Sequence, residues 1–93
     1  MTLNLGLDPP ALWTGCEVRQ LAGQLTLLTP AREAVPRLTA NLSRLAIDPE
    51  EVVLTGGMAI WAYLVAFHFL HGRTRRIYYQ DGRGERVLVA AHG

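Results

Sequence analysis

Short apolar blocks recur along the chain, and their lengths predict alternating strands and helices. Residues 16–22 and 24–29 are predicted as two strands, with Gly23 as the turn between them. The second block is mostly apolar, as is typical of a buried strand. Residues 51–55 form a third apolar block that predicts another short, buried strand.

A helix is predicted between the second and third strands. Thr29 is in position to cap it, Pro30 to occupy its first position and Glu33 to lie in its first turn. Apolar residues then recur at helical spacing: Ala34, Leu38, Leu42 and Leu45. Pro36 predicts a break or a restart within this segment.

The second half of the chain repeats the pattern of strand and helix. Gly56 and Gly57 separate the strand at 51–55 from an apolar helix predicted over 58–70, and Gly72 predicts its end. Two further strands are predicted over the residues on either side of a tight turn, 76–80 and 86–91. The order β-β-α-β-α-β-β predicts an α/β domain with a mixed sheet and at least one parallel pair. We expect residues 1–14 to form an arm or an edge strand and residues 15–93 to form one domain.

Composition narrows the class of protein. The chain has 93 residues, 49% hydrophobic and 18% charged, which argues against a disordered tail, a collagen-like chain or a coiled coil. A single cysteine, Cys16, argues against a disulfide scaffold and a cysteine-rich zinc module. The apolar run over 58–70 is too short to span a bilayer, and the first residues do not resemble a signal peptide. We therefore expect a cytoplasmic protein without a membrane partner.

The distribution of charge is more informative than the net charge of +1. All nine cationic residues are arginines, and five fall in the last 21 residues: Arg73, Arg75, Arg76, Arg83 and Arg86. Guanidinium groups match phosphate oxygens in a bidentate manner. The cluster therefore predicts either a phosphate-binding surface or a solvated, arginine-rich face.

Two patterns in the centre of the chain could carry chemistry. Glycines between a strand and a helix allow backbone N–H groups to approach a phosphate, so the turn at Gly56 and Gly57 is an anion site or simply a tight turn. His68 and His71 lie three residues apart, on one side of the predicted helix. This spacing suits a shared divalent metal or a phosphodiester site, and it also suits two histidines that favour the helix dipole.

A third pattern lies near the end of the chain, where Asp81, Arg83 and His92 follow the histidine pair. Together with the earlier histidines they could supply acid–base chemistry and charge neutralisation for phosphoester cleavage. The alternatives are a local ion pair between Asp81 and Arg83 and a frayed end at His92. We expect His71 and Asp81 to project from the same edge of the sheet.

The ordered set of these patterns resembles a known family. A Thr-Gly-Gly-Met-Ala-Ile-Trp segment at 55–61, the His68 and His71 pair, the Asp81-Gly82-Arg83 turn and a terminal His92 are similar to motifs of the small stand-alone Csx-type ring nucleases of type III CRISPR systems. That family is related to the CARF (CRISPR-associated Rossmann fold) proteins. The resemblance covers residues 16–92 and is strongest over 51–92.

The resemblance implies a CARF-like domain that binds cyclic tetra-adenylate and cleaves it to linear di-adenylate, which switches off antiviral signalling. It also implies manganese dependence, trimming of short adenosine-ended RNA, and homodimers or dimers of dimers that build the site. By the same resemblance, the catalytic positions are His71, Asp81, Arg83 and His92. Metal ligands would come from His68, His71 and Asp81, and ligand contacts from Thr55, Gly56, Gly57, Met58 and Arg76.

The chain departs from the family pattern in the glycine turn. Gly57 stands where the family has an arginine, Met58 where it has a second glycine, and Ala59 where it has a proline. Arg73, Arg75 or Arg76 could replace the missing charge. Three alternatives to the ring nuclease stay open: a non-catalytic module that binds the same ligand, an RNA exonuclease that trims 3′-adenosines, and a structural subunit without a ligand.

Overall fold

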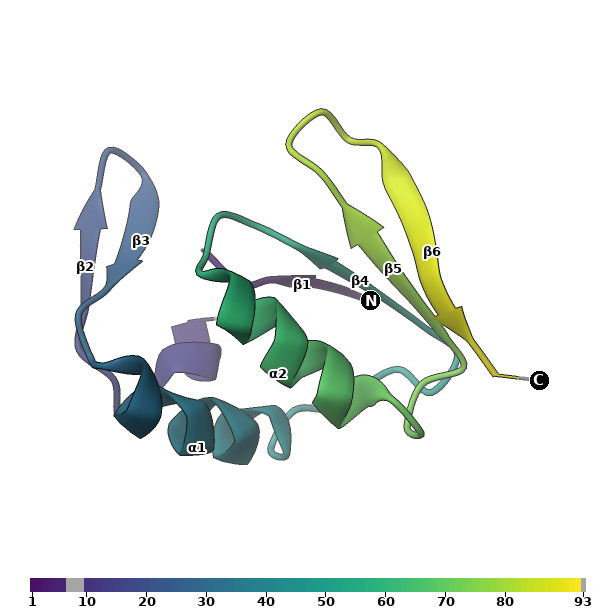
Figure 1. The fold of residues 1–93 in the computed structure, drawn as a ribbon, viewed down its shortest axis with the longest axis horizontal. Coiled ribbons are helices and arrows are strands. Elements are labelled where there is room, and N and C mark those ends of the chain that lie inside the picture. The colour runs from purple at the N-terminus through teal and green to yellow at the C-terminus, as the bar shows by residue number, and fades with distance from the viewer. Residues whose placement is uncertain (7–9, 93) are drawn as a thin grey trace.

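A four-stranded sheet, two helices and a separate hairpin make up the computed structural model (Figure 1), which describes residues 1–6 and 10–92. The strands are β1 (Thr2–Asn4), β2 (Val18–Leu21), β3 (Gln24–Leu27), β4 (Glu51–Thr55), β5 (Arg76–Gln80) and β6 (Arg86–Ala91). The helices are a short 3₁₀ helix η1 (Pro10–Trp13), α1 (Ala31–Leu42) and α2 (Ile60–Leu70).

The sheet is mixed, with strand order β1-β4-β5-β6. β1 and β5 lie parallel to β4 on its two sides, and β6 pairs antiparallel with β5. The connections from β1 to β4 and from β4 to β5 step in the same direction along the sheet. Because such connections are right-handed, α1 and α2 lie on the same face of the sheet, as Figure 1 shows. The predicted α/β class, the mixed sheet and the parallel pair are confirmed.

The core lies between this face and the helices. Strand register places Leu3 beside Leu54 and Val52 beside Ile77, and all four are buried in one apolar cluster. The helices contribute buried residues at the expected spacing, namely Leu38 and Leu42 from α1 and Ala62, Ala66 and Leu70 from α2. Burial of this apolar surface is the main stabilising term of the fold.

The start of the chain belongs to the sheet. β1 is an edge strand, one of the two predicted possibilities for residues 1–14, and residues 7–9 of that segment lie outside the described residues. Asn41 of α1 is buried and donates hydrogen bonds from Nδ2 to the carbonyl oxygens of Leu12 (2.8 Å) and Thr14 (2.9 Å). This buried amide holds η1 against α1.

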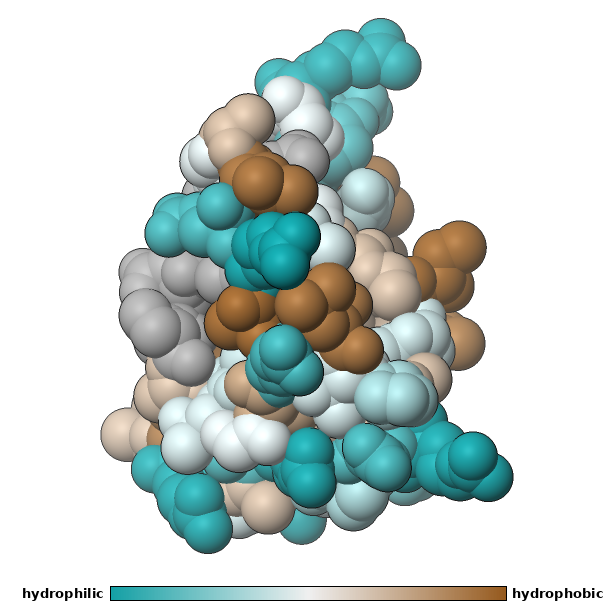
Figure 2. Space-filling model, turned by 90° about the vertical axis from the view of Figure 1, so that its left-hand side faces the viewer, coloured by the Kyte–Doolittle hydropathy of each residue, from teal (hydrophilic) through white to brown (hydrophobic). Residues whose placement is uncertain are grey.

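The predicted strand pair at 16–29 forms a hairpin that lies mostly at the surface. β2 and β3 pair only with each other, and the hairpin stands away from the main sheet (Figure 1). Val18, Leu21 and Leu28 are exposed, and apolar side chains reach the surface among polar ones on this side of the molecule (Figure 2). Burial was predicted for the strand at 24–29, and it holds only in part among the described side chains, because Leu27 packs against the core while Leu28 is exposed.

The first helix also differs in detail from the prediction. Pro30, not Thr29, is the N-cap residue, and Thr29 Oγ1 instead accepts a hydrogen bond from the Glu17 amide (2.7 Å). The helix continues through Pro36 without a break. A proline inside a helix loses the hydrogen bond of its missing N–H and crowds the carbonyl group four residues earlier, and here the buried residues Leu38 and Leu42 hold the following turns in place.

The second helix is shorter than its apolar run, because it begins at Ile60 and has Ala59 as its N-cap residue. It ends before Gly72, whose positive φ of 91° supplies the predicted stop. Among the helices of residues 1–6 and 10–92, none is long and apolar enough to cross a membrane.

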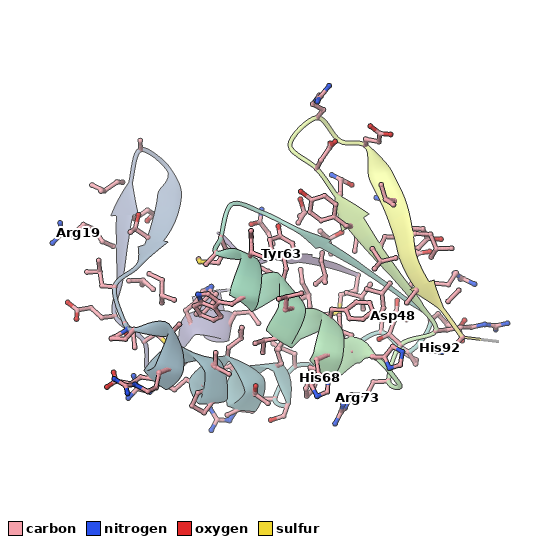
Figure 3. The ribbon with its side chains drawn as sticks, in the orientation of Figure 1. Arg19, Asp48, Tyr63, His68, Arg73 and His92 are labelled. Carbon is pink, nitrogen blue, oxygen red and sulfur yellow. The ribbon has the colours of Figure 1, made fainter. Side chains whose placement is uncertain are left out.

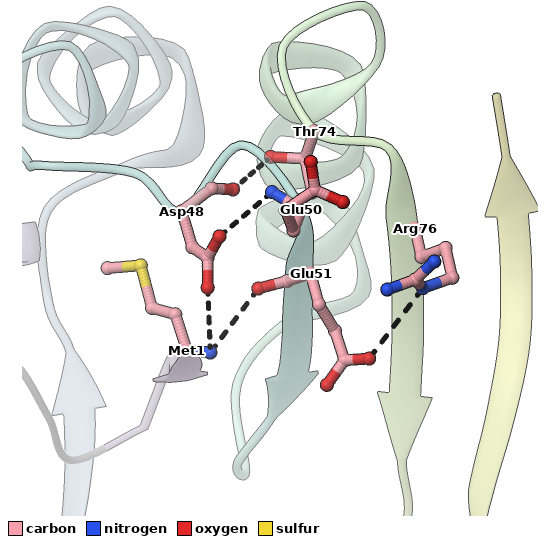
Figure 4. Close-up of polar contacts among 6 residues, drawn as sticks. All are labelled: Met1, Asp48, Glu50, Glu51, Thr74 and Arg76. Atoms are coloured by element: carbon pink, nitrogen blue, oxygen red, sulfur yellow. Dashed lines mark hydrogen bonds and ion pairs between the residues drawn. The ribbon is translucent and has the colours of Figure 1, made fainter. Parts of the chain in front are cut away.

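A polar cluster closes the end of the sheet where β4 and β5 begin (Figure 4). Asp48 Oδ1 accepts the Glu50 amide hydrogen (2.8 Å), and Asp48 Oδ2 lies 3.8 Å from the Met1 amino nitrogen. The Glu50 hydrogen bond, with a smaller contribution from the Met1 amino group, lowers the pKa of Asp48 below its ordinary value of 3.8.

We expect Asp48→Asn to destabilise the protein at neutral pH but not in acid. A lowered folded-state pKa contributes stability above the ordinary pKa and loses it as the pH falls through the lowered value. Urea unfolding of both proteins at pH 7 and at acidic pH measures the difference. Equal differences at the two pH values would contradict this role for the Asp48 charge.

Candidate functional site

The glycine turn follows β4 and packs against the start of the chain. Gly56 has a φ of +104°, and a Cβ atom there would overlap Asn4 Oδ1 and lie 2.8 Å from the Gly6 nitrogen. Gly6 is equally constrained, because a Cβ atom on it would lie 2.5 Å from the Gly57 carbonyl oxygen. Close backbone packing therefore accounts for Gly6 and Gly56 without any ligand.

Neighbouring side chains fix the position of this turn. Thr55 Oγ1 donates a hydrogen bond to the Gln80 carbonyl oxygen (2.8 Å), which ties the ends of β4 and β5 together. The Tyr63 hydroxyl donates to the Gly56 carbonyl oxygen, and burial raises the pKa of that hydroxyl. Met58 is half-buried: it packs against the core and also lines the apolar pocket beside the turn.

Asp81 lies at the end of β5 and organises the turn that leads to β6. Its Oδ1 accepts the backbone amides of Arg83 (2.8 Å) and Glu85 (2.9 Å). The predicted ion pair between Asp81 and Arg83 does not form among the described contacts, and the Arg83 side chain is exposed. Asp81 therefore has a structural role in the turn. A test of its chemistry must distinguish this role from catalysis.

His71 and His92 meet at the other end of the sheet. Their imidazole centroids are 4.5 Å apart at an interplanar angle of 77°, although 21 residues separate them in sequence. His71 is the C-cap residue of α2 and its ring also contacts Phe67. The His92 amide donates to the Arg75 carbonyl oxygen (2.7 Å), so His92 extends the sheet and is not a frayed end.

Three arginines lie at this end of the sheet, and two of them, Arg73 and Arg75, line a hollow with His92. Arg75 and Arg76 lie 3.8 Å from Glu50 and Glu51, respectively, so a carboxylate faces each of them. Arg73 Nη1 donates to the Phe69 carbonyl oxygen (2.7 Å), and its guanidinium group stacks over the Phe69 ring. A hollow of about 320 Å³ lies here, lined by Gly72, Arg73, Thr74, Arg75 and His92.

The candidate residues therefore divide between two ends of the domain. The glycine-turn end comprises Thr55, Gly56, Gly57, Met58, Asp81 and Arg83, and the histidine end comprises His68, His71, Arg73, Arg75, Arg76 and His92. Figure 3 shows His68, Arg73 and His92 at the histidine end. The five residues of β5 separate Asp81 from the histidine pair, a span of about 16 Å.

The expectation that His71 and Asp81 share one edge of the sheet was wrong. A helix that joins two parallel strands must run back along the sheet, so its last residue returns to the end where the next strand begins. Asp81 lies beyond the other end of that strand. One copy of the chain does not bring the two side chains together.

The predicted manganese ligands do not form a set within one copy. Among the described residues, no group of three histidine, cysteine or acidic side chains could hold a metal ion. His68 is exposed near the end of α2, while Asp81 is at the glycine-turn end. Within one copy, these donors therefore do not fit a manganese ion.

An apolar groove between α2 and β6 was not predicted from the sequence. It holds about 620 Å³ and includes Tyr63, Leu64, Phe67, Tyr79 and Val89 among its lining residues. The sequence did carry a signal for an exposed apolar surface: the helix at 60–70 is apolar around its whole circumference, and the sheet can bury only one side of it. No family model, curated protein or solved structure matches this chain.

Proposed function

We propose that this chain is a CARF-like ring nuclease that cleaves cyclic tetra-adenylate to linear di-adenylate in the cytoplasm. The contact between His71 and His92 carries the proposal. Both positions belong to the ordered motif set, and the fold brings them together from segments 21 residues apart. Imidazole is the side chain that serves most often as general acid or base.

The chemistry needs two proton transfers at each phosphodiester. One imidazole takes the proton from a ribose 2′-hydroxyl as the 2′-oxygen forms a bond to phosphorus. The other, protonated imidazole gives a proton to the 5′-oxygen as its bond to phosphorus breaks. The products carry a 2′,3′-cyclic phosphate and a 5′-hydroxyl, and two such cuts convert the ring into two di-adenylates.

Charge at the histidine end supports an anionic ligand. Arg73 has no carboxylate partner among the described contacts, and its side chain lines the hollow beside His92. Arg76 already faces Glu51, so Arg73 is the freer of the two to supply a cation to a phosphate at the histidine end. A guanidinium group at this position neutralises part of the phosphate charge.

Asp81, Arg83 and the glycine turn lie too far away to act on the same phosphate within one copy. Their part in the proposal is to bind the ring and complete the site from a second copy. The turn supplies backbone N–H groups near the start of α2, and Arg83 supplies an exposed cation.

Product analysis tests the proposed function. Purified protein is incubated with cyclic tetra-adenylate, and separately with short RNA ending in adenosines, and the products are separated by chromatography. We expect linear di-adenylate from the ring. An intact ring that stays bound would indicate a non-catalytic module, and release of single adenosines from the linear RNA alone would indicate an exonuclease.

A further inference from the structure

The last turn of α2 carries two phenylalanines, and each contacts a polar side chain four residues later. The ring centroids of Phe67 and His71 are 5.7 Å apart, at an interplanar angle of 41°. The central carbon of the Arg73 guanidinium group lies 4.2 Å from the centroid of the Phe69 ring. Side chains four residues apart lie on the same face of a helix, so both pairs continue the helical arrangement past Leu70.

Hydrogen bonds to the two phenylalanine carbonyl groups strengthen both pairs. The His71 amide donates to the Phe67 carbonyl oxygen (2.9 Å), as the next residue of the helix would. The Arg73 amide donates instead to the Leu70 carbonyl oxygen (2.9 Å), so the Phe69 carbonyl group loses its helical partner. Arg73 Nη1 takes that place, at 2.7 Å. The guanidinium group is therefore held at its edge by a carbonyl oxygen and on its face by a ring.

The phenylalanines connect the core with groups at the surface. His71 and Arg73 are exposed, and they lie on either side of Gly72, where the chain leaves the helix. An exposed side chain samples several rotamers, and a substrate that needs one of them must meet the cost of ordering it. Phe67 and Phe69 are half-buried and pack against the core. Their rings are thus fixed supports for the two mobile side chains.

Both supported side chains meet the same neighbour, His92. The His71 ring lies 4.5 Å from the His92 ring, and Arg73 lines a hollow together with His92. Figure 3 shows Arg73 and His92 at this end of the domain. Two rings from one helical turn therefore place an imidazole and a guanidinium group around one position.

We propose that Phe67 and Phe69 are positioning residues, Phe67 for the His71 imidazole and Phe69 for the Arg73 guanidinium group. The positioning itself rests on the contacts above, and its effect on cleavage rests on the proposed function. A group that is already in place when the substrate binds does not have to be ordered in the transition state. The guanidinium group has five N–H donors, and the Phe69 carbonyl oxygen uses one of them, so the others can serve a phosphate.

The two phenylalanines should affect different kinetic constants. His71 moves a proton only while bonds form and break, so Phe67→Leu should lower kcat for cyclic tetra-adenylate by about 10-fold and leave KM unchanged. Arg73 meets the phosphate charge in the bound substrate as well as in the transition state, so Phe69→Leu should raise KM by about 5-fold with little change in kcat. Leucine keeps an apolar side chain at both positions, and thermal unfolding establishes that each variant is folded.

Matched variants separate positioning from general stability. Phe67→Tyr and Phe69→Tyr retain the ring and should keep the wild-type kcat and KM. Leu27→Ala removes a half-buried side chain that packs against the same core from β3, across the molecule from the end of α2 (Figure 1). It should lower the Tm without changing either kinetic constant.

Nuclear magnetic resonance of the histidine rings follows the position of His71 without any substrate. The chain has three histidines, and the exposed His68 provides an internal reference. The aromatic ring of Phe67 displaces the ring signals of His71, so in Phe67→Leu those signals should move toward the position of the His68 signals. Phe69→Leu and Leu27→Ala should leave them in place.

An unmoved His71 signal in folded Phe67→Leu would overturn the proposal, as would a displaced signal without a loss of kcat in a protein that cleaves the ring. A loss of kcat that Phe67→Tyr or Leu27→Ala shares would also overturn it, because the loss would then not depend on the ring. If the wild type does not cleave cyclic tetra-adenylate but Phe67→Leu displaces the His71 signal, the positioning is supported and the proposed function is removed.

Discussion

Replacing His71 or His92 with alanine should slow ring cleavage by on the order of 100-fold or more while the protein stays folded. The two imidazoles touch at the surface, and His71 is beyond the last turn of α2, so neither ring supports the core. Single-turnover cleavage measures the rate, and thermal unfolding measures the fold. The two substitutions should not be additive, because the histidines act as one unit.

The matched control is Arg19→Ala, which removes an exposed side chain from the hairpin, far from the histidine end (Figure 3). It should cleave at the wild-type rate. If the histidine variants lose activity only in proportion to the fraction of unfolded protein, the two rings are structural. Cleavage at the full rate by a folded His71→Ala protein would also contradict the proposal.

Gly56→Ala should be the most damaging small substitution in the chain. A side chain there meets both a left-handed backbone and the Asn4 side chain, so we expect a loss of about 2–4 kcal/mol. For a domain of this size that loss lowers the Tm by about 10–25 °C. Differential scanning calorimetry measures the change.

Substitutions of two other glycines distinguish the two causes of this loss, backbone strain and steric overlap. Gly23 has a φ of +78°, but a Cβ atom added there would meet nothing within 4 Å, so Gly23→Ala reports backbone strain without a clash. Gly82 is open and has no positive φ, so Gly82→Ala should be nearly neutral. A Gly56→Ala protein as stable as Gly82→Ala would show that the turn is not packed against residues 4–6.

Local signals predicted the elements well. The apolar blocks placed β4, β5 and β6 at their observed residues, and Gly72 marked the end of α2. These features depend on neighbours in sequence, such as a glycine that adopts positive φ or a short apolar run between turns. Pro36 misled the prediction because packing of Leu38 and Leu42 outweighs one missing hydrogen bond.

Long-range placement was less predictable. The motifs put His71 and His92 into one candidate set, but nothing in the spacing of residues shows that their rings touch. They also put Asp81 in that set, although α2 runs back along the sheet and leaves Asp81 at the opposite end. The all-round apolar character of α2 indicates that part of the helix stays uncovered, but only the position of β6 at the sheet edge decides which flank that is.

Mixing two inactive variants tests most directly whether two copies build each site. His71→Ala removes a ring from the histidine end. Asp81→Asn removes charge from the glycine-turn end but retains an oxygen that can accept the Arg83 and Glu85 amides. Each protein alone should lose most of its ring cleavage. The two are mixed in equal amounts, given time to exchange subunits, and assayed on cyclic tetra-adenylate.

Random exchange makes half of the dimers mixed, and each mixed dimer regains one intact site and loses the other. The account therefore predicts recovery of about a quarter of the wild-type activity per chain. A mixture no more active than its two components, under conditions where exchange of subunits is demonstrated, would contradict a site shared between copies.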